Sequence, residues 1–100
     1  MAEIGRLLTA MVTPFTKNGE VDYAIAGQLA SALVDSGSEG IVVTGSTGEA
    51  PSLSNNEKVR MWETVKEAVG ERASIIAGAG TYSTRESIEL VREAEKIGAD

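Results

Sequence analysis

Three strand-like apolar runs alternate with three helix-like stretches along this chain, and this alternation restricts the fold more than any other feature of the sequence. The predicted strands cover residues 7–12, 41–44 and 74–77. None of them alternates polar with apolar residues, which is typical of strands covered on both faces. Right-handed crossovers would make the three strands parallel. The pattern predicts an α/β fold of βαβαβα order, with residues 1–100 as one unit and no internal boundary.

Each predicted helix has a polar capping residue before it and a glycine after it. The expected spans are 22–37, 54–70 and 83–98. The first helix begins at Asp22, whose carboxylate can accept from free N–H groups of the first turn. Its buried stripe is predicted to be Ile25, Leu29 and Leu33.

The second and third helices open with the same four-residue pattern. Ser54 is followed by Glu57, and Ser83 by Glu86, so a reciprocal capping box is predicted at both starts. Apolar residues then recur every three or four positions. They are Val59, Trp62, Val65 and Val69 in the second helix, and Leu90, Val91, Ala94 and Ile97 in the third.

Composition excludes several classes of function. The chain has no cysteine and no histidine, which excludes disulfides, thiolate zinc sites, cysteine nucleophiles and an imidazole base. We predict neither a metal site nor a cofactor. The formal charge is −6 without a run of Lys or Arg, so no nucleic-acid partner is expected. Apolar stretches are far shorter than the roughly 20 residues that span a bilayer, and no basic leader is present, which predicts no membrane partner and a cytoplasmic location.

The loops after the three predicted strands hold much of the glycine and hydroxyl content, and functional residues of parallel α/β folds gather at this edge. The middle loop, residues 45–49, reads Gly-Ser-Thr-Gly-Glu. Its glycines allow a tight turn with exposed N–H groups, which together with the hydroxyls suits an anion such as a carboxylate. The alternative is a turn whose hydroxyls bond only their own backbone. The loops at the opposite edge, 36–39 and 70–72, are interpreted as plain connectors.

Other residues near these loops carry weaker signals. Glu49 is interpreted as a group that orients the loop, and Tyr82 as a rim residue. The segment 78–80 lacks the third glycine of a dinucleotide fingerprint, so we interpret it as close packing against a neighbour. A nucleophilic lysine needs a desolvated strand-end position, and every lysine here is predicted to be solvated. The lysines are Lys17, Lys58, Lys66 and Lys96.

Three segments in chain order resemble one enzyme family. They are Met-Val-Thr-Pro-Phe at 11–15, the stretch 45–58 from Gly-Ser-Thr-Gly-Glu through Ala-Pro-Ser-Leu-Ser to Glu-Lys, and Ile-Ala-Gly-Ala-Gly at 76–80. Together they resemble the dihydrodipicolinate synthases, and more broadly the class I pyruvate-dependent aldolases that include N-acetylneuraminate lyase. The resemblance covers essentially all 100 residues.

The resemblance implies a (β/α)8 TIM barrel, of which this chain covers about the first three βα units. A lysine on the sixth strand would form a Schiff base with pyruvate, which then condenses with aspartate semialdehyde in lysine (diaminopimelate) biosynthesis. Ser46 would be the catalytic hydroxyl of a tyrosine-based proton relay, and Thr47 and Gly48 would bind the pyruvate carboxylate. The family also implies a homo-oligomer, a tetramer. Neuraminate lyases commonly have Ser at the first hydroxyl position, whereas the continuation Ala-Pro-Ser-Leu at 50–53 favours the synthase.

The resemblance also bears on regulation. Lysine-inhibited synthases carry histidines at the start of the second helix and an Asn after the third strand. Here Asn55, Lys58 and Tyr82 occupy the matching positions. A like charge at position 58 disfavours a cationic effector, which implies insensitivity to lysine.

Length is the main departure from the family, because such a barrel needs about 250 residues. The Schiff-base lysine and relay tyrosines are therefore expected outside these 100 residues. The chain is then a piece of the enzyme, or a second chain supplies the rest, or the sequence is truncated. Two other classes stay open: a non-catalytic α/β module that binds an anion at residues 45–48, and a half-barrel that self-associates through unpaired strand edges.

Overall fold

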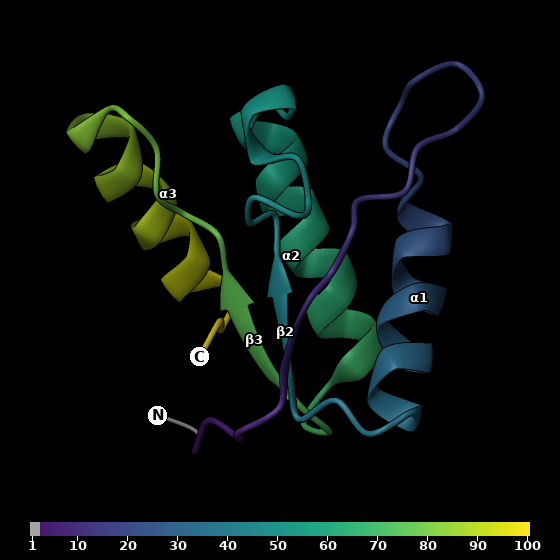
Figure 1. The fold of residues 1–100 in the computed structure, drawn as a ribbon. Coiled ribbons are helices and arrows are strands. Elements are labelled where there is room, and N and C mark those ends of the chain that lie inside the picture. The colour runs from purple at the N-terminus through teal and green to yellow at the C-terminus, as the bar shows by residue number, and fades with distance from the viewer. Residues whose placement is uncertain (1–2) are drawn as a thin grey trace.

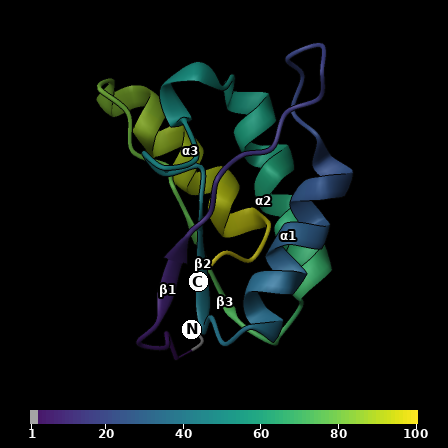
Figure 2. The same cartoon turned by 45° about the vertical axis from the view of Figure 1, so that its right-hand side comes forward.

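The computed structural model describes residues 3–100 and contains one parallel sheet. Its strands are β1 (Leu8–Ala10), β2 (Gly40–Val43) and β3 (Ser74–Ala77), hydrogen-bonded in the order β1-β2-β3. The helices are α1 (Tyr23–Asp35), α2 (Asn55–Val69) and α3 (Thr84–Lys96), and a short 3-10 helix η1 (Ala50–Ser52) precedes α2. All three α-helices lie on one face of the sheet (Figures 1 and 2). The predicted βαβαβα order with parallel strands is confirmed.

Among residues 3–100 the helices cover one face of the sheet only (Figure 2), whereas the sequence pattern predicts strands covered on both faces. Ile41, Val43 and Ile75 are fully buried beneath the helices. Leu8, in contrast, is 40% exposed, and nothing among residues 3–100 covers that face of β1. β1 is also shorter than its predicted span of 7–12, and within residues 3–100 it pairs with β2 alone.

Helix α2 lies at the centre of the packing and begins as predicted. The Ser54 hydroxyl accepts from the Glu57 N–H at 3.1 Å, and the Glu57 carboxylate accepts from the Ser54 N–H at 2.8 Å. This complete capping box fixes the start of the helix and hence the direction of the loop before it. The buried side chains of α2 include Met61, Trp62, Val65 and Val69. Glycines with positive φ follow all three helices, at 37, 70 and 98.

The predicted capping box of α3 forms only in part. The Ser83 hydroxyl accepts from the Glu86 N–H at 3.3 Å. The Ser83 N–H instead donates to the Thr81 hydroxyl at 3.0 Å, so it is not available to the Glu86 carboxylate. Leu90 is buried as predicted, but Val91 is 56% exposed because its side of the helix has no partner among residues 3–100.

Helix α1 has the predicted cap but a different buried stripe. The Asp22 carboxylate accepts from the Ile25 N–H at 3.1 Å. Ala26 and Ala30 are fully buried, whereas Ile25 is 45% exposed, so the prediction of Ile25 in the stripe is wrong. The side of α1 that meets α2 includes Gly27, which faces Ala68 and Thr64, and Ser31, whose hydroxyl bonds the Ala68 carbonyl.

A cation–π contact also joins α1 and α2 near the N-terminal ends of both helices. The Arg60 guanidinium lies over the ring of Tyr23, 3.9 Å from its centroid. Burial raises the pKa of the Tyr23 hydroxyl, and the neighbouring Arg60 charge partly opposes that rise. Tyr23 therefore stays neutral at physiological pH and serves as packing surface.

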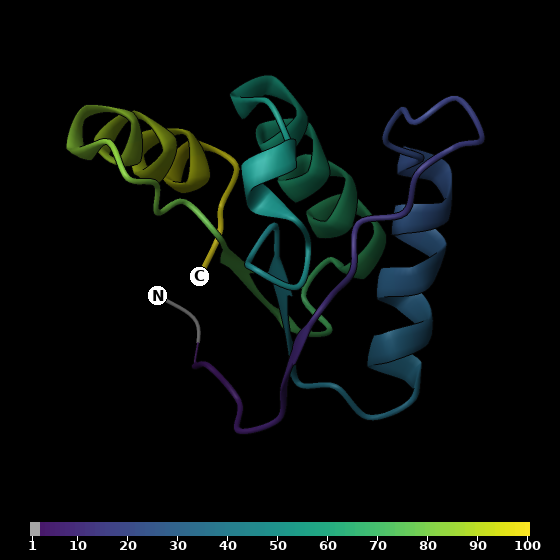
Figure 3. The ribbon, with the colours of Figure 1, turned by 45° about the horizontal axis from the view of Figure 1, so that its top comes forward.

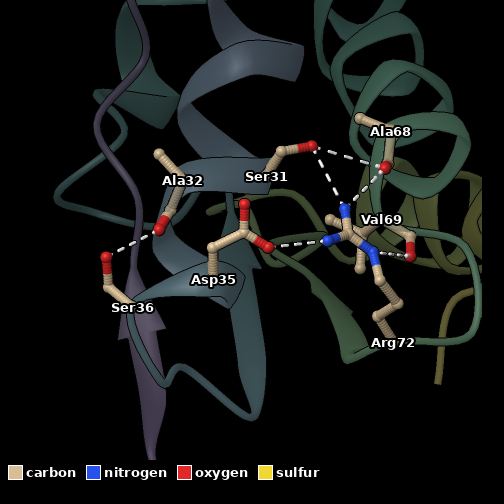
Figure 4. A network of polar contacts seen from close by, with 7 residues as sticks. All are labelled: Ser31, Ala32, Asp35, Ser36, Ala68, Val69 and Arg72. Carbon is tan, nitrogen blue, oxygen red and sulfur yellow. Dashed lines mark hydrogen bonds and ion pairs between the residues drawn. The ribbon is translucent and has the colours of Figure 1, made fainter.

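The connectors at the opposite edge of the sheet are more than plain connectors, which corrects the prediction. The Arg72 guanidinium donates to the Asp35 carboxylate at 2.9 Å, to the Ser31 hydroxyl at 3.2 Å and to the Ala68 carbonyl at 3.0 Å (Figure 4). These contacts join the end of α1 to the turn between α2 and β3. The Glu39 carboxylate similarly accepts from two N–H groups that precede β1.

The Arg72→Lys substitution tests this network. Lysine keeps the charge but cannot supply the forked donors, so we expect a loss of roughly 1 kcal/mol, limited because both Arg72 and Asp35 are largely exposed. Thermal unfolding measures the change. Because the network lies far from the carboxyl ends of the strands, steady-state kinetics should not change; a loss of activity at unchanged stability would contradict this.

Candidate functional site

The segments that follow the three strands meet at one edge of the sheet. Figure 3, with the carboxyl ends of the strands turned forward, shows the segment after β2 between the segments after β1 and β3. The Thr13 hydroxyl, which is buried, donates to the Gly48 carbonyl at 2.7 Å. On the other side, a side chain at Gly78 would collide with the Thr44 carbonyl. The loop at 45–48 is thus held between the ends of β1 and β3.

Two residues with left-handed backbone bracket this loop. Thr44 has φ +56° and Glu49 has φ +59°. Between them the chain folds back, because the Glu49 N–H donates to the Ser46 carbonyl at 3.1 Å and the Ala50 N–H to the Gly45 carbonyl at 3.2 Å. Gly48 is buried in this turn, and a Cβ there would lie 3.1 Å from the Met11 carbonyl oxygen. A side chain at position 48 would therefore be crowded by the backbone that follows β1.

The hydroxyls of Ser46 and Thr47 are both exposed and make no hydrogen bond to any other group among residues 3–100. The same is true of the backbone N–H groups of Ser46, Thr47 and Gly48 within the described chain. The alternative of a turn whose hydroxyls bond their own backbone is therefore not what the structure adopts. Two free hydroxyls beside three free N–H groups form a set of donors that suits a carboxylate or a similar anion.

A cavity of about 670 Å³ lies beside this loop, between the ends of β2 and β3 and the start of α2. Ser46 lines it, but Thr47 and Gly48 do not. The structure thus places the three predicted site residues in one loop without enclosing them in one hollow. The rest of the lining comes from Thr44, Gly45, Ala50, Pro51, Leu53, Ser54, Asn55, Lys58, Gly78, Gly80, Thr81, Tyr82 and Glu86.

Lys58 contradicts the prediction that every lysine is solvated. It is only 5% exposed and lines the cavity, together with Glu86. No carboxylate of residues 3–100 lies within ion-pair distance of its ammonium group. The helical pattern places position 58 on α2 correctly, but the sequence does not indicate that its long side chain is buried beside the cavity.

Three interpretations of single residues can be compared with the structure. Glu49 does not orient the loop through its carboxylate, which is exposed and unbonded among residues 3–100; its left-handed backbone shapes the turn instead. Tyr82 is fully exposed at the cavity wall, as a rim residue should be. Close packing at Gly78 is confirmed by its contact with Thr44.

Three residues that shape the site carry no signal for this role in the sequence: Thr13, Thr44 and Trp62. Thr13 fixes Gly48 across 35 positions of sequence, and Trp62 reaches Thr44 at the end of β2. A buried Thr after a strand and a Trp on a helix are ordinary core residues in any single sequence, so no local signal pairs them. The part of the chain that the structure describes also holds no group of three acidic residues able to bind a metal ion, and no helix long and apolar enough to cross a membrane.

The model of the Dihydrodipicolinate synthetase family matches residues 3–100. A 4-hydroxy-tetrahydrodipicolinate synthase from Heliobacterium modesticaldum is 57% identical over 98% of this chain and 33% of its own length. The crystal structure of dihydrodipicolinate synthase from Bacillus anthracis superposes with a TM-score of 0.94 at 43% identity, over 100% of this chain and 34% of that one. The chloride-inhibited synthase from Acinetobacter baumannii, complexed with pyruvate, gives a TM-score of 0.93 at 39% identity over 98% and 34%. The chain therefore spans about a third of the length of the proteins that it matches.

Proposed function

The chain belongs to the dihydrodipicolinate synthetase family, and from this premise we propose that it supplies the first three βα units of a (β/α)8-barrel lyase that condenses pyruvate with aspartate semialdehyde. The nucleophile would be a lysine in the remaining units, which forms a Schiff base with pyruvate. We use "complete enzyme" for the species in which this chain is joined to those units. In it, the uncovered face of β1, β2 and β3 would line the barrel interior.

The observation that carries this proposal is the loop at 45–48. Its free hydroxyls and N–H groups lie at the carboxyl edge of the sheet, where (β/α)8 enzymes place their active sites. Pyruvate presents a carboxylate that such donors can bind. Thr47 and Gly48 are assigned to that carboxylate. Ser46, the other hydroxyl, is assigned to the proton relay, whose tyrosines would come from the remaining units.

The substrate assignment rests on the relatives and can be tested directly. The complete enzyme is incubated with pyruvate and aspartate semialdehyde, and in a parallel reaction with N-acetylneuraminate. Condensation of the first pair, without cleavage of the second substrate, supports a synthase in lysine biosynthesis. The reverse result would identify a lyase of the neuraminate type, the second candidate, which Ser46 favours at the first hydroxyl position.

Two non-enzymatic alternatives are separated by the mass of the native polypeptide. A species of about 30 kDa supports the enzyme, because a barrel of this type needs about 250 residues. A stable 10.4 kDa monomer would support a small anion-binding module. A 10.4 kDa chain that assembles with itself through the open edges of β1 and β3 would support a half-barrel.

By family resemblance, we propose that the complete enzyme is a homo-oligomer, a tetramer, in the cytoplasm. It needs no cofactor in this proposal, because a Schiff base supplies the electron sink for the reaction. Sedimentation of the complete enzyme measures the oligomeric state.

Insensitivity to lysine is the first prediction of this proposal. Asn55, Lys58 and Tyr82 all line the cavity beside Ser46, so the positions at which a lysine effector would be recognised share one hollow. The ammonium group of Lys58, which lines this cavity and has no carboxylate within ion-pair distance among residues 3–100, would repel a cationic effector there. We expect no inhibition by lysine at sub-millimolar concentration.

The matched variant is Lys58→Met, which removes the charge and keeps much of the stem. It is expected to bind lysine more tightly than the parent in a calorimetric titration. Half-maximal inhibition of the parent enzyme at sub-millimolar lysine would contradict the prediction.

A further inference from the structure

Thr44 is the residue on which the direction of the candidate loop depends. It follows β2 directly, and its φ of +56° lies in the left-handed region. That conformation is rare for a β-branched residue, because its Cβ crowds the following carbonyl. Thr44 is also only 1% exposed. A strained, buried residue at this place persists only if its surroundings hold it.

The group that holds Thr44 is the indole of Trp62. The Trp62 Nε1–H donates to the Thr44 hydroxyl oxygen at 2.8 Å, in a buried bond. The same hydroxyl donates onward to the Gly78 carbonyl at 3.3 Å. The Gly78 N–H in turn donates to the Val43 carbonyl at 2.8 Å. The hydroxyl thus links α2 to the ends of both β2 and β3.

The hydrogen bond between Trp62 and Thr44 both satisfies a buried indole N–H and fixes the residue from which the candidate loop starts. Trp62 is fully buried, so its N–H must find a partner inside the protein, and Thr44 is the acceptor it finds. The loop at 45–48 begins at the next residue. At its other end the loop is fixed by the Thr13 hydroxyl on Gly48. The two ends are therefore held by two independent side-chain bonds, and the free donors lie between them.

We propose that Trp62, acting through the Thr44 hydroxyl, is a positioning residue for the carboxylate-binding loop. It touches neither substrate nor reacting atoms. Its role is to keep Thr44 left-handed, so that the N–H groups and hydroxyls of Ser46 and Thr47 stay preorganised. This inference rests on the proposed function.

The test uses Thr44→Val and Thr44→Ser in the complete enzyme. Valine has nearly the shape of threonine but offers no acceptor to Trp62, whereas serine keeps the hydroxyl. We expect Thr44→Val to raise KM for pyruvate about tenfold, the effect of one lost hydrogen bond. Thr44→Ser should stay within about twofold of the parent. Met61→Leu, a fully buried and volume-conserving change on the same helix, controls for a loosened core.

Coupling between the two residues gives a readout that a merely structural role would not move. Trp62→Phe should raise KM for pyruvate as Thr44→Val does, and the double variant should be no worse than Thr44→Val alone. If Trp62→Phe does not fold, the valine and serine variants decide the matter.

Several results would overturn the inference. They are a Thr44→Val enzyme with the parent KM, a Thr44→Ser or Met61→Leu enzyme impaired as strongly as Thr44→Val, or effects that multiply in the double variant. A parent enzyme that does not bind pyruvate overturns the proposed function as well. A parent that binds pyruvate beside an unaffected Thr44→Val enzyme overturns only this inference.

Discussion

Replacing Ser46 with alanine in the complete enzyme is expected to lower kcat by about 10²–10⁴-fold, the range typical of general acid–base groups. The Ser46 hydroxyl is exposed at the carboxyl edge of the sheet and makes no hydrogen bond among residues 3–100, so it is available to carry a proton. Its removal leaves the backbone N–H groups of the loop in place. KM for pyruvate should therefore change much less than kcat.

The neighbouring hydroxyl gives the matched comparison. Thr47→Val is expected mainly to raise KM for pyruvate, because the bound carboxylate loses one donor at a cost of roughly 1–3 kcal/mol. Ser36→Ala, an exposed serine at the opposite edge of the sheet whose hydroxyl bonds the Ala32 carbonyl, should leave both constants unchanged. Steady-state kinetics in which Ser46→Ala and Thr47→Val have the same effect would refute this division of roles.

Features set by short stretches of sequence could be predicted. The capping box at Ser54 and Glu57 depends on residues three apart, and it forms completely. The glycine at 70 has the positive φ that a helix end demands. The site loop belongs to this class only in part: its Gly-Ser-Thr-Gly sequence predicts a tight turn with hydroxyls after a strand, but leaves open whether those hydroxyls bond their own backbone.

Features set by tertiary partners could not be predicted. The stripe of α1 is centred on Ala26 and Ala30 instead of Ile25, because the partners that pack on a helix decide which of its apolar residues are buried. The box at Ser83 is incomplete, because Thr81 takes the N–H that Glu86 would use. Both outcomes depend on which groups lie next to each other in the folded structure, and helical periodicity does not contain that information.

The candidate site likewise has one part that could be predicted from the sequence and one part that could not. Its donors, at Ser46, Thr47 and Gly48, follow from one loop motif. The groups that hold and surround the donors come from distant parts of the chain, as Thr13, Trp62 and Lys58 do. Lys58 is the clearest case, because a charged residue in the first turns of an amphipathic helix is usually solvated and here is only 5% exposed.

None of the four lysines of this chain is expected to be the Schiff-base nucleophile. Such a lysine needs an amine that is desolvated at the end of a barrel strand. Lys17 lies in an exposed turn, Lys66 lies 3.9 Å from the Glu71 carboxylate, and Lys96 pairs with Glu93 at 3.0 Å. The fourth, Lys58, is buried, but it lies on α2 on the helix-covered side of the sheet, away from the face that would line the barrel.

Borohydride reduction of the complete enzyme in the presence of pyruvate tests this account most directly, because it converts a Schiff base into a stable mass increase on the modified lysine. Peptide mapping by mass spectrometry then locates that lysine, and Lys58→Arg serves as the control for the one buried lysine of this chain. We predict a stoichiometric adduct on a lysine outside these 100 residues, unchanged in Lys58→Arg, and none on Lys17, Lys58, Lys66 or Lys96. A stoichiometric adduct on any of these four, or no adduct anywhere in an enzyme that turns over pyruvate, would contradict the account.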